Sequence, residues 1–139
     1  MENPQNNTRE QQLYQFQYLK EQRDGMAQSL NLINGSLQNF MNTKATVENL
    51  KEVEDNSEIL VPIGGSVIIK ANIQETKKLL TYISQDVVIE KTLDESLVFI
   101  DKIMEEHNQQ IKYLTEQIQK IDVTLQGMSQ LLQQGYPQQ

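Results

Sequence analysis

Apolar residues recur in heptads near both ends of this 139-residue chain, and this pattern limits the folds open to it. In the first repeat they are Phe16, Leu19, Met26, Leu30, Ile33, Leu37, Phe40 and Val47. The second repeat holds Leu93, Leu97, Ile100, Met104, His107, Ile111, Leu114, Ile118, Ile121, Leu125, Met128 and Leu132. A repeat sustained over about four heptads indicates a coiled coil rather than an ordinary amphipathic helix. We therefore predict long helices over residues 8–53 and 92–134.

The ends of the predicted helices carry capping residues. Thr8 and Thr92 are each followed three residues later by Gln or Glu, so each can form a capping box that bonds the first-turn N–H groups. Gly135 and Pro137 are expected to end the second helix, because glycine favours the conformation that follows a helix and proline cannot continue one.

The two repeats match in length, which predicts that the helices fold back on each other as an antiparallel pair. A register that sets the a positions of one helix against the d positions of the other makes three specific pairs. These pairs are Leu30 with Leu114, Phe40 with Met104, and Val47 with Leu97.

Three polar residues interrupt the seams. Arg23 and Lys44 are expected to extend out of the first seam or to tune the choice of partner. His107 is expected opposite Leu37 as a partly solvated seam residue, since one imidazole alone cannot make a metal site.

The segment 58–91 between the helices has β character. Strands are expected over 59–63, 66–73, 79–83 and 87–90. The first two flank the turn Gly64-Gly65, and the last two flank the polar run 84–86, so they form two β-hairpins. Pro62 lacks an N–H and is expected at an edge or bulge. The fold class is therefore α+β, mainly α: a long antiparallel coiled coil with two β-hairpins at the end that joins the helices.

These strands carry apolar side chains on both faces. A sheet that is apolar on both faces needs cover on both, and an isolated hairpin is only marginally stable in water. One narrow helix pair cannot cover two hairpins, so we expect them to build a β-platform by oligomerisation. The expected assembly residues are Leu60, Val61, Ile63, Val67, Ile68, Ile69, Leu80, Ile83, Val87, Val88 and Ile89.

Composition excludes several functions. The net charge of −7 argues against binding to nucleic acid and to anionic membrane surfaces, both of which need Lys and Arg. The absence of cysteine fits a reducing cytoplasm. Residues 1–10 lack the apolar stretch of a signal peptide, and no run is long enough to cross a membrane.

No group of residues predicts catalysis. The neighbouring carboxylates Glu105 and Glu106 diverge on a helix, and Gly64-Gly65 lacks the lysine and helix start of a phosphate-binding loop. We therefore expect no enzyme activity, no catalytic residue, no metal and no cofactor.

In an antiparallel pair, both ends of the chain meet at the end of the coiled coil away from the hairpins. Helix ends pack incompletely, and exposed apolar patches commonly mark binding sites. The candidate contacts with client proteins at these tips are Leu13, Phe16, Leu19, Met128, Leu131 and Leu132, with Tyr14, Tyr18 and Tyr136 adding amphipathic rings. The alternative is that these residues only complete the seam. Leu13 and Leu132 are the stronger candidates, because the register pairs Phe16 with Met128.

A helix, two hairpins and a second helix in this order resemble the α class of prefoldin subunits. The run Leu-Val-Pro-Ile-Gly-Gly-Ser over 60–66 is similar to the family's Leu-Val-Pro and glycine-rich turn, and 70–73 to its Lys-Ala run. Residues 87–91 are similar to its last strand, whereas 84–86 depart from its small-residue turn. A connection of roughly 40 residues suits the two hairpins of the α class rather than the single hairpin of the β class.

The resemblance implies one prefoldin-like domain over 1–139, in a hexamer of two α-class and four β-class subunits whose hairpins form the platform. It implies an ATP-independent chaperone, a holdase, that captures unfolded proteins at the coiled-coil tips and transfers them to a group II chaperonin. The alternative is a coiled-coil scaffold or adaptor subunit of a prefoldin-like complex without chaperonin transfer.

Overall fold

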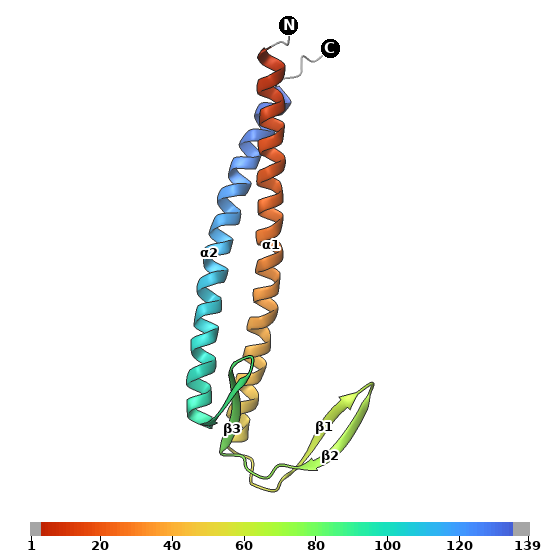
Figure 1. Ribbon diagram of the computed structural model, residues 1–139, viewed down its shortest axis with the longest axis vertical. Coiled ribbons are helices and arrows are strands. Elements are labelled where there is room, and N and C mark those ends of the chain that lie inside the picture. The colour runs from red at the N-terminus through yellow and green to blue at the C-terminus, as the bar shows by residue number, and fades with distance from the viewer. Residues whose placement is uncertain (1–3, 135–139) are drawn as a thin grey trace. The chain divides into compact units, whose positions relative to one another are not determined.

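A computed structural model describes residues 4–134, which form two long helices and four strands (Figure 1). The elements in chain order are α1 Pro4–Leu50, β1 Glu58–Gly64, β2 Val67–Asn72, β3 Lys78–Ser84, β4 Val87–Thr92 and α2 Leu93–Gln134. The strands form two separate antiparallel sheets of two strands each, β1 with β2 and β3 with β4. The predicted fold class, mainly α with two hairpins between the helices, is confirmed.

The chain divides into two compact units. The first contains the residues up to Ser36 and those from His107 onward. The second is Leu37–Glu106, which includes both hairpins. Each unit contains part of α1 and part of α2.

In the first unit, two side-chain contacts fix how the helices pair. The Arg23 guanidinium donates to an Asp122 carboxylate oxygen 2.9 Å away, and this hydrogen bond, with the attraction of the charge, raises the pKa of Arg23. Ser36 Oγ lies 2.9 Å from His107 Nε2. Both contacts are within one residue of the predicted antiparallel register. His107 is a half-buried seam residue, as predicted.

In the second unit, Lys44 of α1 and Lys51, which directly follows α1, each pair with an aspartate of α2. Lys44 Nζ lies 2.7 Å from Asp101, whose hydrogen bond and charge raise the pKa of Lys44. Lys51 Nζ lies 3.0 Å from Asp94. These contacts agree with the predicted register within one residue. The cations therefore do not simply leave the seam, since each meets a carboxylate on the opposite helix.

The helix ends differ in part from the prediction. Helix α1 begins at Pro4, where a proline at the first position loses no intrahelical bond. Thr8 therefore lies inside the helix, its hydroxyl donates to the Pro4 carbonyl at 3.0 Å, and its predicted capping role is wrong. Thr92 does cap α2, since its hydroxyl oxygen accepts from the Glu95 N–H at 3.2 Å. Gly135 and Pro137 lie outside the described residues.

Helix α1 ends at Leu50, three residues before the predicted end. The next residues bond back three positions rather than four, from Lys51 N–H to Glu48 at 3.3 Å and from Glu52 N–H to Asn49 at 3.2 Å. Such bonds tighten a last turn and end the α-helix.

The first hairpin turns at Gly65-Ser66, one residue later than predicted. Both residues have positive φ, 48° and 65°, as the favoured two-residue hairpin turns require. Gly64 ends β1 with φ 122°, a conformation that favours glycine. The register shifts between Pro62 and Gly64, so Ile63 is an extra residue in a bulge, and Pro62 lies beside this bulge as expected.

The second hairpin repeats this construction 20 residues later, from Glu58 to Lys78 and from Val67 to Val87. Its register also shifts before the turn, between Tyr82 and Ser84. Ser84 was predicted in the turn, but it ends β3 and pairs with Val87.

The buried core is small and belongs to the second unit. Val47, Leu93 and Ile100 are only 4 to 6% exposed. The partly buried residues packed against them are Phe40, Leu50, Leu79, Leu97 and Met104. This cluster contains two of the predicted seam pairs, and Leu79 attaches β3 to the helices.

A polar clasp closes the chain at the base of the first hairpin. The Thr76 N–H donates to Asp55 Oδ1 at 2.9 Å. The fully buried Thr76 hydroxyl lies 3.0 Å from the same oxygen and 3.1 Å from the Val53 carbonyl, and either can accept its proton. The backbone hydrogen bond, followed by the hydroxyl, lowers the pKa of Asp55.

Replacing Ile100 with alanine should lower the free energy of unfolding by roughly 2 to 4 kcal/mol, because it leaves a cavity in the small core. The matched control is Val98→Ala on the same helix, where the side chain is 71% exposed and little should change. Thermal unfolding followed by circular dichroism checks both. Equal losses in the two variants would contradict the described core.

Asp55→Asn should lower the thermal midpoint at neutral pH. Because the folded-state pKa of Asp55 is below its unfolded value, its contribution is present above about pH 4 and is lost as pH falls through the folded pKa. The difference between the parent and the variant should therefore shrink at acidic pH. Asp86→Asn, in the exposed second turn, is the control. A variant as stable as the parent at pH 7 would exclude the clasp.

Candidate assembly and client-contact surfaces

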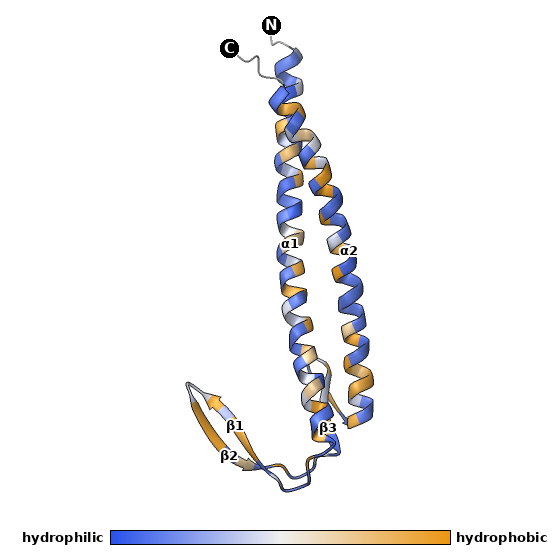
Figure 2. Cartoon of the chain, turned by 180° about the vertical axis from the view of Figure 1, so that it is seen from behind, coloured by the Kyte–Doolittle hydropathy of each residue, from blue (hydrophilic) through white to orange (hydrophobic). Residues whose placement is uncertain are grey.

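The first candidate surface is formed by the two hairpins, whose strands are rich in apolar residues (Figure 2). The structure places all eleven predicted assembly residues in the strands, and ten of them are exposed. Leu80 is the extreme case, with 78% of its surface exposed. Ile89 is the half-buried exception.

Both faces of the first hairpin are apolar, as predicted. On one face, Leu60 pairs with Lys70, and Pro62 pairs with Ile68. On the other face, Val61 pairs with Ile69. Because the sheet has only two strands, each strand also leaves one edge unpaired within its sheet.

The second hairpin differs because one of its faces is partly covered. Leu79 packs against the core cluster, and the neighbouring positions Thr81 and Ile89 are half-buried. On the opposite face, Leu80 and Tyr82 remain exposed. An apolar surface of this kind is typical of a protein–protein interface.

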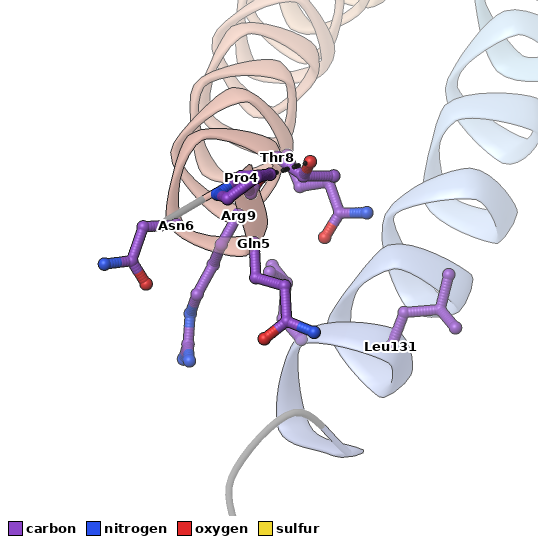
Figure 3. Close-up of a pocket in the computed structure, with 8 residues that line it drawn as sticks. Pro4, Gln5, Asn6, Thr8, Arg9 and Leu131 are labelled. Carbon is purple, nitrogen blue, oxygen red and sulfur yellow. Dashed lines mark hydrogen bonds between the residues drawn. The ribbon is translucent and has the colours of Figure 1, made fainter. Parts of the chain in front are cut away.

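The second candidate surface lies in the first unit, where the start of α1 meets the end of α2. A hollow of about 540 Å³ opens there between the first turns of α1 and the last turns of α2 (Figure 3). Its lining residues are Pro4, Gln5, Asn6, Thr8, Arg9, Gln12, Leu131 and Leu132. The α1 side is mainly polar, and the two leucines supply the apolar side.

The six predicted tip residues separate into two groups. Leu13 is 43% exposed and Leu131 is 64% exposed, so both are available for contact. The other four are half-buried, and they are Phe16, Leu19, Met128 and Leu132. These four occupy seam positions of the heptad repeats. Leu131 is therefore more accessible than Leu132, although the sequence pattern favoured Leu132.

The tyrosines near these leucines are also exposed. Tyr14 and Tyr18 lie on the surface of α1, and the Tyr18 hydroxyl accepts a hydrogen bond from Gln22 at 2.9 Å. Tyr136 lies outside the described residues. The polar lining from Pro4 to Gln12 was not predicted, since the helix was expected to begin at Thr8.

Among residues 4–134, no three His, Asp or Glu side chains are grouped so as to hold a metal ion. Neither described helix is long and apolar enough to span a bilayer.

The sequence matches the family model for prefoldin subunits over residues 19–138. It is 32% identical to prefoldin subunit alpha of Pyrococcus horikoshii over 100 residues, which cover 71% of this chain and 68% of the relative. It is 34% identical to prefoldin subunit alpha 1 of Thermococcus kodakarensis over 94 residues, covering 68% of this chain and 64% of that relative.

Solved structures show the same fold. Filamentous prefoldin from Methanocaldococcus jannaschii aligns with a TM-score of 0.72 at 16% identity, covering 81% of this chain and 93% of that one. The prefoldin beta subunit from Thermococcus strain KS-1 aligns with a TM-score of 0.60 at 15% identity, covering 99% and 100%. Prefoldins are chaperones that assemble from several subunits, and this chain belongs to the prefoldin subunit family, with alpha subunits among its relatives.

Proposed function

We propose that this chain acts, as a single domain over 1–139, in an ATP-independent holdase of two α-class and four β-class subunits. In this proposal the complex works in the cytoplasm. The hairpins join the subunits, and the helix ends capture unfolded proteins. The captured clients are then transferred to a group II chaperonin.

The observation that carries the proposal is the exposure of the hairpins. Leu60, Ile68 and Leu80 are more than half exposed, whereas the core within residues 4–134 holds three buried apolar residues. Such strands are only marginally stable alone, so partner chains would stabilise them by covering them. The assembly role rests on this apolar surface and on the family to which the chain belongs.

Client capture is proposed for the helix ends. Leu13 and Leu131 provide exposed apolar contacts, and Tyr14 adds a ring with a polar end. A non-native client presents apolar segments of no fixed sequence, and small contacts of this kind bind each segment weakly. Several copies of the surface in one complex would raise the effective concentration and hence the overall affinity.

A scaffold or adaptor role is the second candidate. It would use the same exposed hairpin strands to join a prefoldin-like complex, without transfer to a chaperonin. A scaffold would bind one folded partner tightly and ignore denatured proteins. A holdase would suppress the aggregation of unrelated denatured proteins.

Replacing both Leu13 and Leu131 with serine should weaken client capture, because the exposed apolar contacts are lost at every copy of the surface. We expect the complex concentration that half-suppresses aggregation of a denatured protein to rise about tenfold, since avidity multiplies a small loss at each site. Light scattering during dilution from denaturant measures this. The matched control is Leu32→Ser, also on α1 and 76% exposed, which should have no effect.

The assembled mass of each variant should equal that of the parent. Equal suppression by the parent and the double variant at equal mass would contradict capture by these leucines. Loss of suppression in the Leu32→Ser control as well would show a general effect of exposed apolar surface instead.

A further inference from the structure

An apolar groove lies within the second unit, between α1, β3 and the start of α2. Its volume is about 460 Å³. Its lining includes Val47 and Ile100, which belong to the buried core, and the exposed side chains of Leu80 and Tyr82. Small-molecule sites in proteins commonly have volumes of roughly 300 to 1,000 Å³. The groove therefore has a buried floor and enough space for a small ligand.

Aromatic side chains line this groove from three elements. They are Phe40 of α1, Tyr82 of β3 and Phe99 of α2. Lys91 Nζ lies 5.3 Å from the centre of the Phe99 ring, and this cation–π contact restrains the ring. Aromatic rings pack favourably on one another, either offset-stacked or edge to face. The lining therefore favours an aromatic ligand over an aliphatic one.

The charge of the lining limits the ligand further. Among the described residues that line the groove, none carries a charge, and Lys91 contacts Phe99 from outside this lining. A carboxylate or an ammonium group would lose its hydration in the groove without meeting an opposite charge, and burying an unpaired charge is far more costly than burying a neutral polar group. The lining therefore favours an uncharged ligand.

Two threonine hydroxyls on the α1 side of the groove can accept hydrogen bonds. The Thr43 hydroxyl donates its proton to the Asn39 carbonyl at 2.9 Å. The Thr46 hydroxyl donates to the Asn42 carbonyl at 3.1 Å. Because each oxygen keeps a lone pair, this side suits a ligand that donates a hydrogen bond.

A buried serine adds the most specific polar group. Ser96 lines the groove and is 3% exposed, and among residues 4–134 its Oγ is the buried side-chain atom of its kind with no hydrogen-bond partner. Buried polar groups are nearly always hydrogen-bonded, because an unpaired one destabilises the protein. A serine hydroxyl both donates and accepts, and it turns about a single bond. A ligand hydroxyl in the groove would therefore suit Ser96.

We propose that this groove binds an uncharged aromatic molecule that carries one hydroxyl group, of the chemical class of a naphthol. The ring system packs between Phe40 and Phe99, and its hydroxyl pairs with Ser96. This site is separate from the helix ends proposed for client capture. It shares Leu80 with the surface proposed for assembly, so binding must be measured both in the free chain and in a complex.

The test titrates the full chain with 2-naphthol by calorimetry, alone and in complex with a β-class prefoldin subunit. We expect one molecule to bind per chain with a Kd of about 0.1 mM, within the range open to a ligand of about eleven non-hydrogen atoms. The matched ligand is 2-naphthoate, in which a carboxylate replaces the hydroxyl on the same rings. It should bind at least about tenfold more weakly.

Ser96→Ala separates a ligand contact from a structural role of the serine. It should weaken the binding of 2-naphthol about three- to tenfold and leave the binding of naphthalene, which has no hydroxyl, unchanged. Ser84→Ala is the matched control, because Ser84 is exposed at the end of β3 and lies outside the lining. Thr46→Trp should fill the groove and remove the binding of both molecules. Circular dichroism checks that each variant keeps its helices.

Amide chemical shifts locate the bound molecule. We expect 2-naphthol to shift the amide signals of Val47, Thr81 and Ile100, which line the groove, and to leave those of β1 and β2 in place. No saturable binding, shifts confined to other elements, or equal affinities for 2-naphthol in the parent and in Ser96→Ala would each overturn the inference. Binding to the free chain that is lost in the complex would show that a partner chain covers the groove, and it would overturn the site in the assembled protein.

Discussion

The two helices bury apolar side chains along one narrow seam. This seam is too small to cover the apolar residues of the strands as well. Seam positions of both helices are mostly half-buried, and among the apolar residues of 4–134 only Val47, Leu93 and Ile100 reach the low exposure of a true core. Leu79 joins the second hairpin to that core. The remaining apolar residues of the strands have no such support within the described chain. Their exposure is the observation behind the proposed assembly through the hairpins.

Polar contacts supplement this small core in two ways. Between the helices, Lys44 and Asp101 hold a register that an apolar seam alone would specify less strictly. At the base of the first hairpin, Asp55 accepts a hydrogen bond from the Thr76 N–H and lies 3.0 Å from its hydroxyl, which ties two irregular segments together. Lys44 and Asp101 are both partly exposed, so the main effect of their ion pair is on geometry rather than on total stability.

Much of the fold could be predicted because it follows from periodicity. The heptads gave the helices and their register to within one residue, and the apolar runs gave four strands in two hairpins. The exact position of the hairpin turns was harder to predict from the sequence. Two glycines suggested the turn at Gly64-Gly65, but the bulge at Ile63 moves it by one residue. The predicted cap at Thr8 was wrong, because a threonine hydroxyl can bond back to a carbonyl inside a helix as well as cap one. Thr8 bonds in this way to the Pro4 carbonyl.

Contacts between irregular segments had no sequence signal. Asp55 and Thr76 are separated by the whole first hairpin, and neither belongs to a periodic pattern. The relative accessibility of the candidate tip residues was also not predicted. Leu132 occupies a seam position of the heptad repeat and is half-buried, whereas its neighbour Leu131 lies off the seam and is exposed. The predicted assembly residues were better defined, because alternation along a strand assigns each side chain to a face.

The central claim is that the hairpins of this chain are completed by other prefoldin subunits. Native mass spectrometry of the chain mixed with a β-class subunit tests it most directly. The account predicts a complex of two copies of this chain with four of the partner. A chain that stays monomeric in the mixture, with its hairpins still folded, would contradict it.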